Sequence, residues 1–368
     1  MKNFKLHASK CILLSSIVLL YCYNKYAGKE IVFETKYETV SYDDNIIEEE
    51  TITDKIEENK EPVEENVVDK KEITISFAGD CTLGNDKKVT YFNDMVASQN
   101  NDYSYFFSNV KDIFKNDDYT LVNLETTFTD TTSYADKQFN FKGDFEYVNI
   151  LKEGYIEGVN ISNNHTMDYL EKGYNDTIIT LEKTNIDYSG DEHIHVEEID
   201  GIKFGFIGFK NANLNYDNIN DKLNKIKELN PDIIVASCHW GVEGTHEFTQ
   251  EQQEIGHYLI ENGVDIVIGH HPHVLQGIEE YNNKYIIYSL GNFCFGGNRN
   301  PKDKDTMIVQ EKFYFENNEL INTELKIIPC SISSVSEYND FKPTILVDEE
   351  KERVLEKVKK YSYNYNLK

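Results

Sequence analysis

The chain has 368 residues and a formal net charge of −28 at pH 7. This length allows one large domain or two ordinary ones, with a core that needs no disulfide support. The charge argues against a nucleic-acid partner, because such partners select basic surfaces. The six cysteines, at positions 11, 22, 81, 238, 294 and 330, include no Cys-x-x-Cys pair, so they indicate no disulfide framework.

An uncharged stretch, Cys11–Tyr23, follows three lysines within the first ten residues. A short apolar run behind basic residues is typical of a signal sequence or signal anchor. Its thirteen residues would span only ~20 Å of a ~30 Å hydrocarbon core, so snorkelling of the flanking lysines would have to lengthen it. We interpret residues 1–29 as an uncleaved, single-pass anchor in the cell membrane; a cleaved signal peptide is the alternative. The lysines would keep the N-terminus cytoplasmic and place the bulk of the chain on the extracytoplasmic side.

Residues 30–72 are predicted to be a disordered acidic stalk. Between Glu38 and Glu72, fourteen Asp or Glu residues stand against four Lys, and four minus fourteen gives a charge of −10. Such a segment repels itself and cannot bury enough apolar area to fold. A solvated linker is the preferred interpretation, and an acidic interaction arm is the alternative.

From Ile73 onward, strand-like runs alternate with helical patterns, which predicts an α/β domain over residues 73–335. The predicted strands are Ile73–Ala78, Tyr119–Leu124, Gly158–Ser162, Lys203–Gly208, Asp232–Ser237, Asp265–Gly269 and Lys284–Ser289. The predicted helices are Tyr169–Thr184, Asn218–Asn230 and Gln250–Gly263. Strand-like alternation of residue types from Thr306 to Ile328 predicts hairpins that close a sheet edge. Residues 336–368 are predicted to be a tail with a surface helix over Val347–Tyr361.

Nearly every predicted strand ends in side chains able to bind a metal ion or an oxyanion. In open α/β sheets, ligands bind at the carboxyl ends of strands, so six such ends are expected to meet on one face. The end segments are Gly79-Asp80, Asn123-Leu124-Glu125, Asn163-Asn164-His165, Cys238–Gly241, Gly269–His273 and Ser289–Phe293.

Each of these segments alone is a weak signal, because Gly-Asp and Asn-Asn are ordinary turn or capping pairs. The segment from His271 to His273 is stronger: residues two apart in extended backbone project to the same side, and Pro272 stiffens the turn. Joint occurrence at successive strand ends predicts a divalent-metal site.

Six segments together resemble the motif series of the CapA-type poly-γ-glutamate capsule biosynthesis proteins. They are Phe77–Cys81, Val122–Thr126, Val159–Tyr169, Cys238–Glu243, Val267–Gly277 and Tyr288–Phe293, and the match extends from Ile73 to about Phe295. That family is similar to the calcineurin-like metallophosphoesterases. The resemblance implies a metallophosphatase-like two-sheet sandwich flanked by helices (α-β-β-α) with one or two divalent metal ions.

The resemblance also implies roles for single residues. Asp80 and His273 would bind the first metal, and Glu125 would stand where a carboxylate often bridges two metals. Asn164, His239 and His271 would bind the second metal. His165 would face the substrate as general acid or transition-state donor. The residues expected to contact substrate are Asn123, Asn163, Trp240, Glu243 and Asn292. Imidazole with carboxylate and amide oxygen suits Mn, Zn or Fe better than Ca or Mg.

One position departs from the metallophosphoesterase pattern. Where Asp-x-His is usual, this chain has Asp80-Cys81-Thr82, so the first metal lacks an imidazole. Thr82 or Glu243 could compensate, or the site could hold a single metal. The cysteines beside the motifs, Cys81, Cys238 and Cys294, could supply a thiolate, although small buried residues are the simpler interpretation. Trp240 could equally wall the site or belong to the core.

Three functions agree with these features. The first is an envelope-facing component of poly-γ-glutamate or related capsule synthesis or export, working with other synthase subunits and holding the anionic polymer at metal ions. The second is a metal-dependent hydrolase of a phosphoester or amide, in which His165 assists the leaving group. The third is a non-catalytic assembly scaffold. Enzyme status stays open, with a preference for a hydrolase-like site.

Overall fold

The computed structural model of the protein describes residues 68–211 and 214–365. The predicted anchor (1–29) and residues 30–67 of the predicted stalk lie outside these ranges. None of the helices in the described ranges combines the length and apolar character needed to cross a bilayer. The first described strand begins at Lys70, slightly before the predicted start of the domain.

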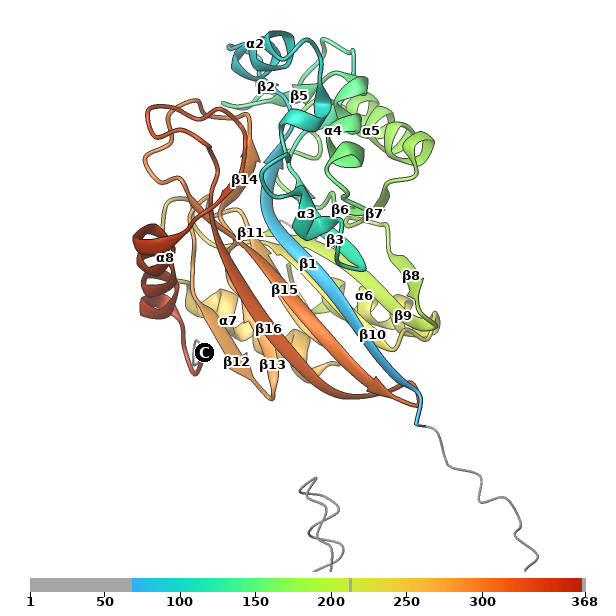
Figure 1. The fold of residues 1–368 in the computed structure, drawn as a ribbon. Helices are drawn as coiled ribbons and strands as arrows, with labels where there is room; N and C mark the ends of the chain where they lie inside the picture. Colours follow the sequence, from blue (N-terminus) through green and yellow to red (C-terminus); the bar gives the residue numbers. More distant parts are fainter. Residues whose placement is uncertain (1–67, 212–213, 366–368) are drawn as a thin grey trace, which may run out of the picture. The chain divides into compact units, whose positions relative to one another are not determined.

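A large mixed sheet is the first strand layer (Figure 1). Its order is β17-β16-β15-β1-β3-β6-β7, and β14 pairs with the end of β1. β1, β3, β6 and β7 run parallel, whereas β15 and β16 form a long antiparallel hairpin beside β1. The strands are β1 Lys70–Thr82, β3 Tyr119–Leu124, β6 Gly158–Asn160, β7 Asp187–Ser189, β14 Asn292–Phe295, β15 Asp305–Glu316, β16 Glu319–Ser331 and β17 Thr344–Ile345.

A second sheet has the order β12-β13-β11-β10-β9-β8, with parallel strands β9, β10, β11 and β13 between antiparallel edges. Its strands are β8 His195–Ile199, β9 Ile202–Lys210, β10 Ile233–His239, β11 Ile266–His270, β12 Ile278–Tyr281 and β13 Lys284–Ile287. A small third sheet joins β2 Asn85–Asp86, β5 Phe141–Gly143 and β4 Thr127–Phe128.

Two of the longer helices begin at polar caps. The Asn215 side chain accepts a hydrogen bond at the start of α6, and Thr249 with Gln252 forms a capping box at the start of α7. The helices are α2 Tyr91–Ser98, α3 Lys111–Phe114, α4 Val148–Glu153, α5 Leu170–Thr184, α6 Tyr216–Glu228, α7 Gln250–Glu261 and α8 Asp348–Tyr361, with single 3-10 turns η1 Tyr103–Tyr105 and η2 Phe145–Tyr147.

Buried apolar side chains form three clusters, and these define the layers. One cluster lies between the two sheets and includes Phe77 of β1, Phe204 of β9 and Val235 of β10. A second joins the first sheet to α2, α3, α4 and α5, for example through Leu181. A third joins the second sheet to α6 and α7, for example through Leu259. The prediction of an α/β fold is therefore confirmed, with helices covering the outer face of each large sheet.

The predicted elements agree with the structure in kind, and several short elements were not predicted. Strands appear in all seven predicted runs, and helices in the three predicted segments. The elements not predicted are β7, β8, β12, β14, β17, the small sheet and α2 to α4. The predicted hairpin lies at one edge of the first sheet, because β15 pairs along β1 and β16 pairs with β17 only at Cys330 and Ser331.

The C-terminal segment is part of the core. Val354 and Val358 of α8 are buried in the cluster between the sheets. Arg353 donates to both carboxylate oxygens of Asp305 at 2.7 and 2.6 Å, which ties α8 to the start of β15. The predicted surface helix is therefore exposed along most of its length, while its buried face packs against β12 and β16 and covers one side of the sandwich.

Val354→Ala is expected to lower the free energy of unfolding by about 1–3 kcal/mol, because it removes buried methyl groups and leaves a cavity. The matched control is Val347→Ala, since Val347 directly precedes α8 and is 65% exposed. Urea denaturation of both variants measures the difference. Equal stability of the two variants would mean that α8 is an accessory tail.

Candidate metal centre

The carboxyl ends of parallel strands from both large sheets meet at one site. In the first sheet, Asp80 near the end of β1 is the register partner of Asn123 in β3 and of Asn292 in β14. In the second sheet, His239 and His270 are the last residues of β10 and β11 and lie opposite each other. The two sheets touch there, since Asp80 Oδ2 lies 3.2 Å from His273 Nδ1. The strand ends predicted to converge are therefore brought together.

The Glu125 carboxylate occupies the middle of this site. It follows β3 directly, has no exposed surface, and neither of its oxygens has a hydrogen-bond partner. Oε1 lies 3.5 Å from His239 Nε2 and 3.8 Å from His165 Nε2, and Oε2 lies 3.9 Å from His273 Nδ1. Burial raises the pKa of Glu125 well above its usual value; the charge of His273 opposes this shift, and that of Asp80 adds to it.

A first possible cation position lies between Asp80, Glu125 and His273, whose potential ligand atoms are all within 4.8 Å of one another. Burial would raise the pKa of Asp80, but the imidazoles of His270 and His273, whose Nδ1 atoms lie 3.5 and 3.2 Å from the carboxylate, hold it well below its usual value. Burial opposes protonation of His273, yet Glu125 and Asp80 raise its pKa to about 10. This imidazole therefore binds a proton tightly at the place where a cation would also be attracted.

A second possible position lies between Glu125, His239 and His271, again within 4.8 Å. The rings of His239 and His271 have centroids 4.6 Å apart, and Asn164 Oδ1 lies 2.9 Å from His239 Nε2. Burial lowers the pKa of His239 and of His271, so both rings favour the neutral form that binds metals. Glu125 belongs to both positions.

The backbone around Pro272 differs from the prediction. His271 has φ 97° and His273 has φ 57°, so this segment is not extended. Positive φ at a residue other than glycine is strained and is often found at functional sites. The two rings still both face the centre, with centroids 6.0 Å apart. The two rings therefore lie close together as expected, although the backbone between them is not extended.

The residues present fit a divalent cation at each position. Two buried carboxylates, three imidazoles and one amide oxygen form a donor set that suits Mn, Zn or Fe. The unpartnered oxygens of Glu125 are the main support, because a buried anion without hydrogen bonds is costly unless a cation meets it. Metal binding would also displace the proton of His273, since a ligating imidazole is neutral.

His165 faces the same centre from the turn after β6. Its Nδ1 lies 2.7 Å from Asp168 Oδ2, and its Nε2 points toward Glu125. Its ring packs on Phe141 with centroids 4.4 Å apart. Burial lowers the pKa of His165, an effect that Asp168 opposes. Asp168 had no predicted role, although its position three residues after His165 was the available signal.

Asn123 and Asn163 lie beneath the centre and bind other protein groups. Asn123 Nδ2 donates to Asp80 Oδ1 at 2.8 Å, and its Oδ1 accepts from Asn160 and Asn163. Asn292 Oδ1 lies 2.9 Å from His273 Nδ1. These amides orient the candidate ligands, and the substrate contact predicted for them stays a prediction.

The remaining predicted residues are divided between rim and core. Glu243 is exposed, and its carboxylate comes within 4.8 Å of ligand atoms of His271 and His273. Trp240 has no exposed surface and lies in the cluster between the second sheet and its helices, which favours the core role; its predicted substrate contact stays a prediction. Its indole donates to the Tyr288 carbonyl at 3.0 Å, which satisfies its one polar atom inside the core.

Thr82 and the cysteines beside the motifs are all buried. The Thr82 hydroxyl is buried without a hydrogen-bond partner. Cys81 and Cys294 lie in one hydrophobic cluster and Cys238 lies in another, and burial raises the pKa of each thiol. The simpler interpretation of the cysteines, as small buried residues, agrees with this placement.

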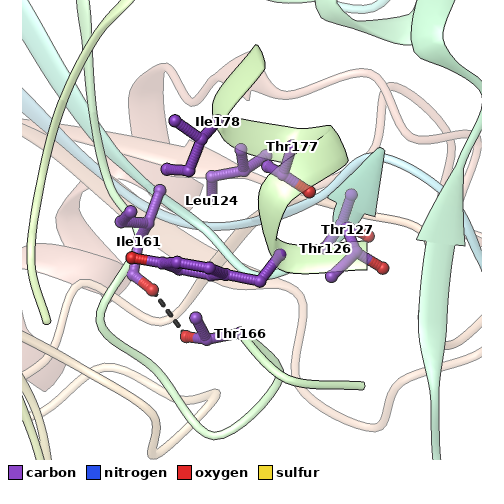
Figure 2. A pocket seen from close by; sticks show the side chains of 8 residues that line it. Leu124, Thr126, Thr127, Ile161, Thr166, Thr177 and Ile178 are labelled. Atoms are coloured by element: carbon purple, nitrogen blue, oxygen red, sulfur yellow. Dashed lines mark hydrogen bonds between the residues drawn. The ribbon is translucent and has the colours of Figure 1, made fainter. Parts of the chain in front are cut away.

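The small cavity in Figure 2 is separate from the centre. Its walls combine Leu124, Thr127 and Ile178 with other apolar or hydroxyl side chains, and none of the candidate ligands lines it. The Thr166 hydroxyl donates to the Ile161 carbonyl at 2.5 Å beside it, which fixes the turn that carries His165.

Glu125→Gln is expected to make the metal-free chain more stable by about 1–3 kcal/mol near pH 8, because it removes a buried charge. Folding raises the pKa of Glu125, so protonated Glu125 contributes to the stability of wild type below about pH 4.5. This contribution is lost as the pH rises through the pKa that Glu125 has in the folded state. The advantage of the variant should therefore grow with pH in thermal unfolding.

The matched control is Glu311→Gln. Glu311 is also buried with one unpartnered oxygen, but it lies in β15 away from the centre, and burial raises its pKa to about 8. The stability of both variants relative to wild type should increase with pH, and only Glu125→Gln should lose metal affinity. A metal-free Glu125→Gln chain that is less stable than wild type at every pH would contradict the buried-anion interpretation.

Comparison with known proteins identifies the family. The family model described as "Bacterial capsule synthesis protein PGA_cap" matches residues 74–297, a range that contains all the candidate ligands. The capsule biosynthesis protein CapA of Bacillus anthracis is 29% identical over 295 residues, covering 72% of this chain and 69% of its own. The PGA biosynthesis protein CapA of Bacillus subtilis (strain 168) is 29% identical over 262 residues, covering 65% of this chain and 67% of its own. The chain therefore belongs to the bacterial capsule synthesis protein PGA_cap family.

Proposed function

We propose that this chain is an envelope-facing component of capsule-polymer synthesis or export, and that its centre holds an anionic polymer such as poly-γ-glutamate through one or two divalent cations. The observation that carries the proposal is the buried, unpartnered carboxylate of Glu125 among three imidazoles. The name of the Bacillus subtilis relative supports the choice of polymer.

Charge is the physical reason for the cations. A chain of net charge −28 repels a polyanion at long range. Divalent ions between Asp80, Glu125 and the histidines would be the largest local charges and would reverse the field at that point. Carboxylates of the polymer could then approach a site that is otherwise lined with acids.

The layer order and the shared Glu125 support a further proposal, a metallophosphatase-like α-β-β-α domain. Asp80 and His273 would hold one cation, and His239, His271 and Asn164 the other, with Glu125 between them. The N-terminal residues 1–29 would anchor this domain to the cell membrane on the extracytoplasmic side, next to other capsule synthase subunits. The test of the anchor is whether the full-length chain stays in the membrane fraction after alkaline extraction.

The second candidate function is a metal-dependent hydrolase of a phosphoester or amide, and the His165–Asp168 pair favours it. Bound divalent cations supply Lewis-acid polarisation of a substrate oxygen. His165 presents Nε2 to the centre while Asp168 holds Nδ1, the arrangement of an oriented proton-transfer group. Donation to a leaving group requires the ring to carry both protons, a form that the Asp168 carboxylate stabilises.

The metal proposal is tested with the full-length chain in detergent. After loading with Mn²⁺ or Zn²⁺ and removal of free metal, wild type is expected to retain one or two ions per chain. His271→Ala is expected to lose at least one, because the second position then keeps only Glu125, His239 and Asn164.

The matched control is His195→Ala. His195 belongs to another His–carboxylate group with Asp187 and Glu197, outside the centre, so its loss should leave the stoichiometry unchanged. Wild type without bound ions, or loss of ions only in His195→Ala, would rule out the proposed centre.

The two functions are separated by incubating the metal-loaded chain with poly-γ-glutamate and with a generic phosphodiester. Polymer binding that depends on metal and on His271, without cleavage, supports the first function. Cleavage of either compound that is lost in His165→Gln supports the second. Neither binding nor cleavage with a fully loaded centre would favour the non-catalytic scaffold.

A further inference from the structure

Lys137 contacts the candidate site from a distant loop. It lies between β4 and β5, and its amine reaches three groups of the turn after β6. It donates to Asp168 Oδ1 at 2.7 Å and to the Asn164 carbonyl at 2.9 Å, and it lies 3.3 Å from His165 Nδ1. One lysine thus contacts the backbone of the candidate ligand Asn164, the candidate proton-transfer residue His165 and the carboxylate of Asp168 beside that histidine.

The donors around Asp168 fix the proton on His165. Asp168 Oδ1 accepts from Lys137, and Oδ2 accepts from the Phe141 backbone N–H at 2.5 Å and meets His165 Nδ1 at 2.7 Å. An ammonium group and a backbone amide can only donate, so both carboxylate oxygens accept. The 2.7 Å contact of Oδ2 with His165 Nδ1 is shorter than the 3.3 Å contact of Lys137 with the same atom, so Nδ1 donates to Asp168 rather than accepting from the amine. The hydrogen of the neutral ring therefore belongs on Nδ1, and Nε2 is the open edge toward Glu125.

We propose that Lys137 is a positioning residue: its ammonium group holds Asp168 and the Asn164 carbonyl so that His165 keeps Nε2, and Asn164 keeps its side-chain oxygen, directed at the centre. The inference rests on the proposed function for the role of the centre, but the geometry of His165 can be measured without metal.

The burial of the pair explains why the amine is needed. The Asp168 side chain has no exposed surface, whereas that of Lys137 is 30% exposed. Without the amine, this buried carboxylate would lose the lysine that holds Oδ1 and would keep only the Phe141 N–H and His165 on Oδ2, so it would turn toward other donors or water. Such a movement releases His165 Nδ1 from its acceptor. The Asn164 carbonyl would lose its contact with the amine at the same time.

The test compares Lys137→Met with Lys137→Arg, in full-length chain with ¹⁵N-labelled histidine. In wild type without metal, NMR of the ring nitrogens should show His165 protonated at Nδ1, with His165→Gln used to assign the signal. Lys137→Met should give a mixture of tautomers and weaken binding of the second Mn²⁺ or Zn²⁺ about tenfold or more, as is typical for partners behind metal ligands. Lys137→Arg should restore both.

The matched control is Lys284→Met. Lys284 has the same 30% side-chain exposure, pairs with Asp265 at 2.8 Å and donates to the Val264 carbonyl at 2.9 Å, remote from the centre. Lys284→Met should lose about as much stability as Lys137→Met, but it should change neither the His165 signal nor the metal affinity.

If Lys137→Met lowers the melting temperature as Lys284→Met does but keeps the Nδ1 tautomer and the metal affinity, Lys137 is only a loop tether and the inference is wrong. If wild type binds no ion, the proposed metal function fails, while the tautomer measurement still decides the role of Lys137.

Discussion

The rest of the centre depends on one electrostatic constraint, the Glu125 carboxylate buried without a hydrogen bond. Burial in an apolar interior costs an anion several kcal/mol unless positive charge or donors compensate it. Here the neighbours are imidazoles, which can be protonated or can bind metal, and another acid, Asp80. Glu125 and Asp80 hold the pKa of His273 high, whereas burial holds that of His239 low, so the ligands differ in charge state before any cation binds.

The centre also depends on the packing of the two large sheets. The first sheet and the segments after its strands provide Asp80, Glu125 and the turn with Asn164 and His165, whereas the second provides His239, His271 and His273. The apolar cluster between the sheets, which includes Phe77 and Val235, sets the distance between these two halves. Helix α8 contributes Val354 and Val358 to that cluster, so the C-terminal segment supports the site without touching it.

Much of the fold could be predicted because its signals are local. Buried strands such as β10 are continuous apolar runs, and α7 has a capping box at its start. The short elements were missed because β2, β4 and β5 contain only two or three residues each and carry no period. The surface position of α8 agrees with the prediction, but its contribution to the core was not predicted, because the strands that its two buried valines contact lie far away in sequence.

The sequence by itself determined the candidate ligands and the family, because both depend on residue types in fixed order along the chain. Tertiary structure alone decided which oxygens and nitrogens face one another, and it decided that Trp240 packs in the core. It also added Asp168 and Lys137, whose contact joins segments 31 residues apart. The physical reason is that ligand identity is a local property, whereas the burial of Glu125 and the partners of His165 exist only after distant strands and loops pack together.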